Sequence, residues 1–312
     1  MKISFVIPCY RSENTIEGVV SEIKSVVAQR PEISYEIIMV SDHSPDSVYQ
    51  VIDRMCREDP GHLKGLELVR NFGQHAALMA GYSRASGDLI FSLDDDGQAP
   101  VESLYVMIDK LLAGMFDVVY GTYRNKKYGW FRSFGSKVND LMTVWLLDKP
   151  SGLKVTSFFV ARNFVVSEML KYQGPYPYIY GLVFRITKNI GEVPVEHRAR
   201  QSGESGYGFA KLLGLWMNGF TAFSVKPLRL ASYAGFVCAI MGFFFGIWAV
   251  VNKLYINPSA PVGYSSLMAA LLFIGGVLML MLGLIGEYIG RIYICINRSP
   301  QYVVSKETGV YE

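Results

Sequence analysis

The chain has 312 residues, of which 51% are hydrophobic, and its formal net charge is +3. So small a charge, without a long basic run, argues against nucleic-acid binding. Four scattered cysteines exclude a metal site built on closely spaced cysteine pairs. Charged and apolar segments alternate over residues 1–209, whereas charges nearly vanish from Leu230 onward.

The first 120 residues predict alternating strands and helices. Short apolar runs predict strands at residues 3–7, 36–40, 66–69, 89–93 and 117–120. Apolar residues at helical spacing predict helices that begin near Ser12, Asp46, His75 and Pro100, the last two ending at Gly87 and Gly114. This alternation predicts a Rossmann-like α/β domain, with a mostly parallel sheet and helices on both faces.

Polar segments follow three of the predicted strands, at residues 8–10, 41–44 and 94–98. Ligands of open α/β sheets bind beyond the carboxyl ends of the strands. We therefore expect these three segments to converge on one site.

Asp94, Asp95 and Asp96 are the most informative residues in these segments. Three adjacent carboxylates repel one another, and bound Mg²⁺ or Mn²⁺ would relieve that repulsion. Residues two apart on a strand point to the same side, so Asp94 and Asp96 are the expected metal ligands. A solvated acidic loop is the alternative.

Asp42 and Tyr10 have the chemistry to hold a nucleoside. A carboxylate at Asp42 can accept hydrogen bonds from a base or ribose, and the Tyr10 ring can stack on a base. A turn explains Asp42 equally well, and a single tyrosine such as Tyr10 is more often simply packed.

Two clusters of arginines suit phosphate groups: Arg124 with Arg132, and Arg198 with Arg200. Arginine binds phosphate oxygens through paired, charge-assisted hydrogen bonds. Contact with lipid headgroups is the alternative for both clusters. The four histidines show no ligand spacing, and the roles of His75 and His197 stay open.

Two apolar runs, 230–252 and 264–287, are each long enough to cross ~30 Å of hydrocarbon. Basic residues are plentiful before the first run and after the second, which predicts that both termini are cytoplasmic. Residues 210–229 predict an interfacial helix and linker, and 288–312 a cytoplasmic tail. Buried core helices, and an ordinary linker helix, are the respective alternatives.

Short motifs cover nearly the whole chain, at residues 6–10, 40–44, 70–73, 87–98, 200–205, 223–229 and 286–291. In this order they resemble family 2 glycosyltransferases of the dolichol-phosphate mannosyltransferase type, most closely bacterial bactoprenol glucosyltransferases. The resemblance implies a GT-A fold, a uridine or guanosine diphosphate sugar donor and a divalent metal. It also implies inversion at the anomeric carbon, a polyprenyl (undecaprenyl) phosphate acceptor, and a homo-oligomer such as a tetramer in the bacterial cytoplasmic membrane.

The residues and the resemblance together predict one composite site. The residues predicted to bind the nucleotide are Pro8, Tyr10, Asp42 and Asp94. The predicted catalytic residues are Asp94, Asp96 and Gln98, with the two aspartates as metal ligands. The residues predicted to bind the diphosphate or the acceptor are Arg124, Arg132, Arg198, Arg200 and Ser205.

The chain departs from the family pattern at three positions. Ser41 stands where an acidic pair is common, Ser299 splits an Arg-Pro pair, and Ser157 stands where many members have an aspartate. The last departure removes a candidate general base. A lipid phosphate has a second pKa of about 6 and is mostly a dianion at neutral pH, so it is already a nucleophile. We therefore expect that no protein base is needed and that Ser157→Ala retains most activity.

Three functions compete. The first is transfer of a hexose, by default glucose from a UDP donor, to polyprenyl phosphate. The second is transfer from the same donor to another acceptor, such as diacylglycerol or a polysaccharide. The third is a non-catalytic membrane scaffold, against which the intact Asp94 and Asp96 argue.

Overall fold

The computed structural model describes residues 1–123, 144, 149–150, 152–196, 226–251, 255, 263–297 and 299–309. The chain forms two compact units. One comprises Met1–Tyr207 together with Arg298–Glu312, and the other comprises Gly208–Asn297. Of the predicted interfacial helix and linker at 210–229, residues 210–225 lie outside the described residues.

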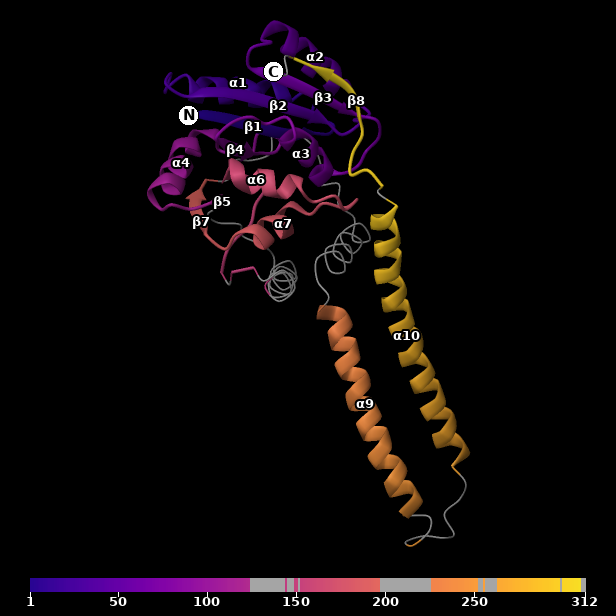
Figure 1. Ribbon diagram of the computed structural model, residues 1–312. Coiled ribbons are helices and arrows are strands. Elements are labelled where there is room, and N and C mark those ends of the chain that lie inside the picture. The colour runs from indigo at the N-terminus through magenta and orange to yellow at the C-terminus, as the bar shows by residue number, and fades with distance from the viewer. Residues whose placement is uncertain are drawn as a thin grey trace. The chain divides into compact units, whose positions relative to one another are not determined.

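The first unit is built on an eight-stranded sheet of order β7-β5-β6-β4-β1-β2-β3-β8 (Figure 1). The strands are β1 Lys2–Cys9, β2 Ser34–Ser41, β3 Leu63–Leu68, β4 Leu89–Ser92, β5 Val118–Tyr123, β6 Phe159–Arg162, β7 Ile190–Val195 and β8 Val304–Thr308. β1 pairs in parallel with β2 and β4, β2 with β3, and β5 with β7. β6 and β8 are antiparallel to their neighbours, so the predicted mostly parallel sheet is confirmed.

Helices cover both faces of this sheet (Figure 1). They are α1 Ile16–Val27, α2 Val48–Glu58, α3 Gln74–Tyr82, the short 3-10 helix η1 Val101–Ser103, α4 Leu104–Ala113, α6 Asn163–Leu170 and α7 Ile179–Ile186. Apolar residues of α1, α2 and α4 join Phe5 and Ile37 in one hydrophobic core. α3 covers the opposite face, where a Cβ on Gly81 would come within 2.3 Å of Val6. Only glycine at this position lets the helix approach the strand so closely.

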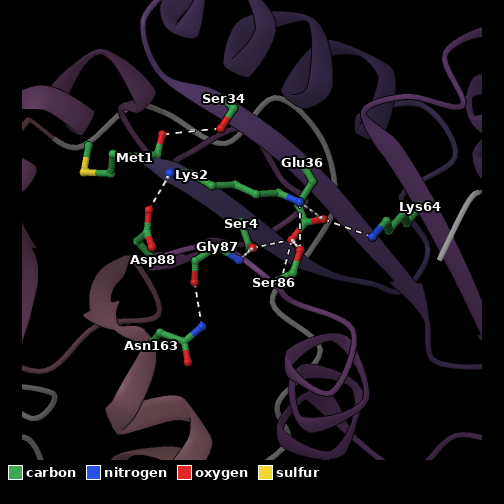
Figure 2. Close-up of polar contacts among 10 residues, drawn as sticks. All are labelled: Met1, Lys2, Ser4, Ser34, Glu36, Lys64, Ser86, Gly87, Asp88 and Asn163. Atoms are coloured by element: carbon green, nitrogen blue, oxygen red, sulfur yellow. Dashed lines mark hydrogen bonds and ion pairs between the residues drawn. The ribbon is translucent and has the colours of Figure 1, made fainter. Parts of the chain in front are cut away.

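A buried polar cluster lies at the amino-terminal ends of the central strands, opposite the end where the site was expected (Figure 2). Glu36 of β2 is 2% exposed and accepts hydrogen bonds from Ser4 Oγ at 2.5 Å and from the Ser86 N–H at 2.7 Å. Lys2 and Lys64 form ion pairs with it at 3.1 and 3.0 Å. Burial raises the pKa of Glu36, but these donors outweigh burial and lower it to about 2.

This cluster explains one difference from the predicted helices. The helix predicted to reach Ser86 ends at Tyr82. The backbone N–H of Ser86 is bonded to Glu36, and the N–H of Gly87 donates to Ser4 Oγ at 2.8 Å. These tertiary bonds draw the chain out of the helix and into β4.

The carboxyl-terminal segment returns to the sheet. β8 pairs antiparallel with β3 and forms one edge of the sheet. Its Glu307 and Lys306 form ion pairs with Arg84 at 2.5 Å and Glu67 at 2.8 Å. The sequence predicted only a tail at 288–312, so this strand is a structural finding.

The second unit contains two long helices, α9 Lys226–Val251 and α10 Tyr264–Ile296, which contact each other. Large apolar side chains are exposed along both, with Phe243 66%, Phe273 66% and Met279 74% exposed. Among the described residues, one segment, Phe273–Ile296, is long and apolar enough to cross a membrane, whereas the apolar part of α9, Ala231–Phe245, is shorter. The predicted spans were 230–252 and 264–287.

Candidate active site

The three polar segments predicted to converge do so at the carboxyl ends of β1, β2 and β4. The backbone N–H of Tyr10 donates to Asp95 Oδ2 at 2.9 Å, and the N–H of Arg11 donates to Ser44 Oγ at 2.7 Å. The N–H of Asp42 donates to the Cys9 carbonyl at 3.1 Å. These bonds tie the loops after the three strands together, which confirms the topological prediction.

Two of these loops hold backbone strain. Arg11 and His43 have φ angles of 59° and 50°, and each lies just beyond the end of its strand. A non-glycine residue in the left-handed region costs of order 1 kcal/mol or more and persists only where its surroundings fix it. Such strain is common at functional sites, and here both strained residues lie in the loops that converge.

Asp94 is held from two sides. Its Oδ1 accepts a hydrogen bond from Gln74 Nε2 at 2.7 Å, and its Oδ2 accepts one from Ser157 Oγ. Burial raises the pKa of Asp94 to about 6, and the charges of Asp96 and Asp95 add to this effect. A carboxylate kept in such a setting is stabilised in its charged form when a cation is near.

The two neighbouring aspartates have different partners. Asp95 accepts the Tyr10 N–H, and its backbone carbonyl accepts a hydrogen bond from Thr15 Oγ1 at 2.7 Å. Asp96 Oδ1 accepts the backbone N–H of Gln98 at 3.1 Å, across a turn in which Gly97 has a φ of 70°. The three adjacent aspartates therefore have different roles in the fold. Asp95 bonds the loop after β1, whereas Asp94 contacts α3 and the segment before β6.

The donor chemistry of Asp94 and Asp96 fits a hard cation. Within the described ranges, no three His, Cys, Asp or Glu side chains gather into a metal-binding group. Mg²⁺ and Mn²⁺ are commonly held by one or two carboxylates plus substrate phosphates and water. The metal-ligand roles of Asp94 and Asp96 stay a prediction that this chemistry permits.

Asp42 has a structural task that the sequence did not reveal. It is 3% exposed, and its two carboxylate oxygens accept the backbone N–H groups of Phe72 at 2.7 Å and Gly73 at 2.8 Å. Gly73 has a φ of 93°, which favours glycine at the start of α3. Asp42 thus fixes the loop before α3, and its contact with a nucleoside stays a prediction.

The remaining predicted site residues fall into two groups. Pro8 lies in β1 opposite Val40, and the Tyr10 ring is 44% exposed, with the Arg11 guanidinium 5.6 Å from its centroid. Their nucleotide contacts stay predictions. The basic residues and the serine predicted to bind phosphates lie outside the described residues, as does His197: Arg124, Arg132, Arg198, Arg200 and Ser205.

Two contacts at the site were missed by sequence reasoning. Gln74 directly follows the motif at 70–73 and bonds Asp94, so the motif carried a signal for it. The sequence shows Ser157 only as the loss of an acidic residue, whereas its hydroxyl donates to Asp94, which lies 63 positions away in the sequence. No local pattern encodes that contact.

Comparison with known proteins adds to this geometry. Residues 4–168 match the family model for glycosyl transferase family 2, and residues 226–292 match the model for the GtrB C-terminal hairpin. An undecaprenyl-phosphate 4-deoxy-4-formamido-L-arabinose transferase of Proteus mirabilis is 33% identical over 99% of this chain and 94% of its own length. The transferase of that name from Salmonella choleraesuis is also 33% identical, over 98% of this chain and 93% of its own.

Solved structures agree on the fold. Mannosyl-3-phosphoglycerate synthase from Rubrobacter xylanophilus superposes with a TM-score of 0.51 at 16% identity, over 75% of each chain. Glucosyl-3-phosphoglycerate synthase from Mycobacterium tuberculosis, crystallised with Mn²⁺, UDP-glucose and phosphoglyceric acid, also has a TM-score of 0.51, at 18% identity. That match covers 70% of this chain and 77% of the other. At such identities the likeness extends to the GT-A fold alone.

Proposed function

The chain belongs to glycosyl transferase family 2, and we propose that it transfers a sugar from a nucleoside diphosphate donor to undecaprenyl phosphate. The observation that carries the proposal is the presence, in one chain, of a carboxylate cluster at the carboxyl ends of the central strands and of a pair of apolar helices. Relatives that match nearly the whole chain are undecaprenyl-phosphate transferases. Among the sugars, glucose from UDP-glucose is our first candidate, and a modified pentose like that of these relatives is the other.

Asp94 and Asp96 would hold Mg²⁺ or Mn²⁺. When bound, the cation would supply positive charge to offset the leaving diphosphate. Residues of the chain hold these two carboxylates in position before the cation binds. Gln74 and Ser157 orient Asp94, while the Gln98 N–H holds Asp96. Such preorganisation lowers the cost of arranging charge during the reaction.

The loops at the carboxyl ends of β1 and β2 would hold the nucleoside of the donor. Tyr10 presents an exposed ring for stacking on the base. Asp42 fixes the loop that precedes Gln74, and so it positions the donor site whether or not it contacts the ribose. Arg124, Arg132, Arg198, Arg200 and Ser205 are proposed to bind the diphosphate and the incoming lipid phosphate, because arginine pairs well with phosphate oxygens.

The acceptor needs no protein base under this proposal. A lipid phosphate with a second pKa of about 6 is already mostly dianionic at neutral pH. One of its oxygens would attack the anomeric carbon as the bond to the diphosphate breaks, with inversion at that carbon. The main task of the protein is then to bring two anionic substrates together.

The second unit supports a membrane location. α10 has 33 residues, and at 1.5 Å per residue it is roughly 50 Å long, more than the ~30 Å of a hydrocarbon core. Exposed phenylalanine and methionine side chains along both helices would face lipid. We propose a two-span hairpin in the bacterial cytoplasmic membrane, with the catalytic unit and both termini cytoplasmic and the chain assembled as a homo-oligomer.

A transfer assay with purified full-length protein in detergent tests this function. The protein is incubated with UDP-glucose, other nucleotide sugars and Mn²⁺, in the presence of undecaprenyl phosphate, of diacylglycerol or of no lipid, and lipid products are identified by mass spectrometry. We expect one sugar to appear on undecaprenyl phosphate. Transfer to diacylglycerol instead would favour the other acceptor class. Absence of any transfer or donor hydrolysis would favour a non-catalytic scaffold.

A further inference from the structure

A cluster of aromatic rings includes the residue that follows Gln74 and has no part in the proposed mechanism. His75, one residue after Gln74, packs edge-to-face against Tyr178 and Tyr180, with ring centroids 5.2 and 5.5 Å apart. Tyr178 and Tyr180 pack edge-to-face against each other at 5.5 Å. The three rings come from the amino-terminal ends of α3 and α7, and we call them the His75 cluster.

The His75 cluster adjoins the carboxylates. Gln74, the neighbour of His75 on α3, donates to Asp94 at 2.7 Å. Burial raises the pKa of Tyr180, and the charge of Asp94 raises it further. The cluster therefore borders the position where a diphosphate and its attached sugar would lie.

Two buried polar atoms of α3 and β5 lack a partner within the part of the chain that the structure describes, and one of them belongs to the His75 cluster. They are Nδ1 of His75 and the hydroxyl of Tyr120, a fully buried residue of β5. After burial, the largest cause that raises the pKa of Tyr120 is Tyr180. A buried polar atom without a hydrogen bond is costly and rare in folded proteins. The unpartnered Nδ1 of His75, on a ring that packs against both tyrosines, indicates a ligand group that completes it.

The chemistry of the cluster favours a sugar over a phosphate. Burial lowers the pKa of His75 to about 4, so the ring is neutral at physiological pH and offers no positive charge to an anion. Tyr120, Tyr178 and Tyr180 are likewise uncharged. Aromatic faces with a few polar atoms suit a sugar ring, which has apolar C–H faces and hydroxyl edges.

We propose that His75, together with Tyr178 and Tyr180, forms the subsite that recognises the transferred sugar, with Nδ1 of His75 hydrogen-bonded to a sugar hydroxyl or nitrogen substituent. This proposal rests on the function proposed above, because it assumes a nucleotide-sugar donor. It assigns the discrimination between sugars to α3 and α7. The carboxylates are left to bind the cation and the diphosphate common to all donors.

Equilibrium binding to the full-length protein, without lipid acceptor, tests the proposal. The ligands are UDP-glucose, UDP-galactose, UDP-N-acetylglucosamine and UDP-xylose, with UDP as the sugar-free reference, and GDP-mannose with GDP. His75→Phe keeps a ring of similar shape but removes both nitrogens. We expect it to weaken the best-bound nucleotide sugar by about tenfold, in line with the loss of one buried hydrogen bond, and to leave the free nucleotide within about twofold.

Two further variants control the experiment. His62→Phe is the matched control, because His62 also stacks on a tyrosine, Tyr35 at 4.6 Å, but lies just before β3 at its amino-terminal end. It should change no affinity. His75→Asn places an amide nitrogen or oxygen near the position of Nδ1 and should restore part of the sugar-dependent affinity. Melting temperatures establish that each variant is folded.

The outcomes separate this subsite from the proposed function. Equal weakening of UDP and UDP-sugars by His75→Phe, or unchanged affinity for every sugar, would overturn the subsite. A wild-type protein that binds all the sugars equally would overturn it as well. Because no lipid is present, these results do not depend on transfer to undecaprenyl phosphate, which the product assay measures separately.

Discussion

Replacement of Glu36 by glutamine tests how the buried polar cluster at the amino-terminal end of the sheet stabilises the fold. The lysines and hydroxyls around Glu36 lower its pKa from an ordinary 4.5 to about 2, against the opposing effect of burial. One pKa unit corresponds to about 1.4 kcal/mol. The charged carboxylate therefore contributes on the order of 3 kcal/mol to the free energy of unfolding at neutral pH.

The sign of the pH dependence follows from the lowered pKa. Above pH 4.5 the glutamate is charged in both the folded and the unfolded chain, and its stabilisation is fully present. As the pH falls toward 2, the unfolded chain takes up the proton first, and the stabilisation is lost. The difference between wild type and Glu36→Gln should thus be about 3 kcal/mol at pH 7 and should shrink between pH 4.5 and pH 2.

Urea unfolding of the full-length protein in detergent, followed by far-ultraviolet circular dichroism, measures this difference. Glu32→Gln is the matched control, because Glu32 is exposed just before β2 and should change stability by less than about 0.5 kcal/mol. A Glu36→Gln protein as stable as wild type at pH 7 would show that the charged carboxylate does not stabilise the fold. So would a stability difference that stays constant from pH 7 to pH 3.

Three further predictions concern the site and the membrane hairpin. Ser157→Ala removes a donor to Asp94 and should lower kcat by about tenfold. This loss is larger than the sequence alone suggested but far smaller than the loss expected for Asp96→Ala. A loss as large as that of Asp96→Ala would instead indicate that a protein base exists. Asp42→Ala leaves the N–H groups of Phe72 and Gly73 without their acceptor, so it should destabilise the protein by about 2 kcal/mol and raise the donor KM; unchanged stability would contradict its structural task. Ser259→Cys, in a background without the exposed Cys238 and Cys295, should react with an impermeant thiol reagent from outside intact cells, and labelling only after lysis would contradict the two-span topology.

Much of the catalytic unit was predictable because local pattern and global fold agree there. The five predicted strands correspond to β1 to β5, since each is a short apolar run buried on the sheet. The rule for parallel sheets then placed Tyr10, Asp42 and the run 94–96 together. The hydrogen bonds from the Tyr10 N–H to Asp95 and from the Asp42 N–H to the Cys9 carbonyl bear this out.

The elements that sequence reasoning missed depend on distant contacts. β8 has the sequence VSKET and is mostly exposed, so it lacks an apolar alternation and exists as a strand through pairing with β3. β6 has four residues and is inserted antiparallel between β4 and β5. The Ser157 to Asp94 bond and the His75 cluster likewise join segments far apart in sequence, which periodicity cannot reveal.

Transfer of a sugar to undecaprenyl phosphate is tested most directly by following radiolabelled sugar into the lipid phase. Full-length wild type and Asp96→Ala are incubated with undecaprenyl phosphate and labelled nucleotide sugar, with Mn²⁺ or with EDTA, and the organic extract is counted. We expect label in the lipid phase only for wild type with the metal. For Asp96→Ala we expect a loss of about a hundredfold or more, because a metal ligand that stabilises the leaving diphosphate is gone. Full transfer by Asp96→Ala in EDTA, or no lipid-linked sugar from wild type with any donor, would contradict these expectations.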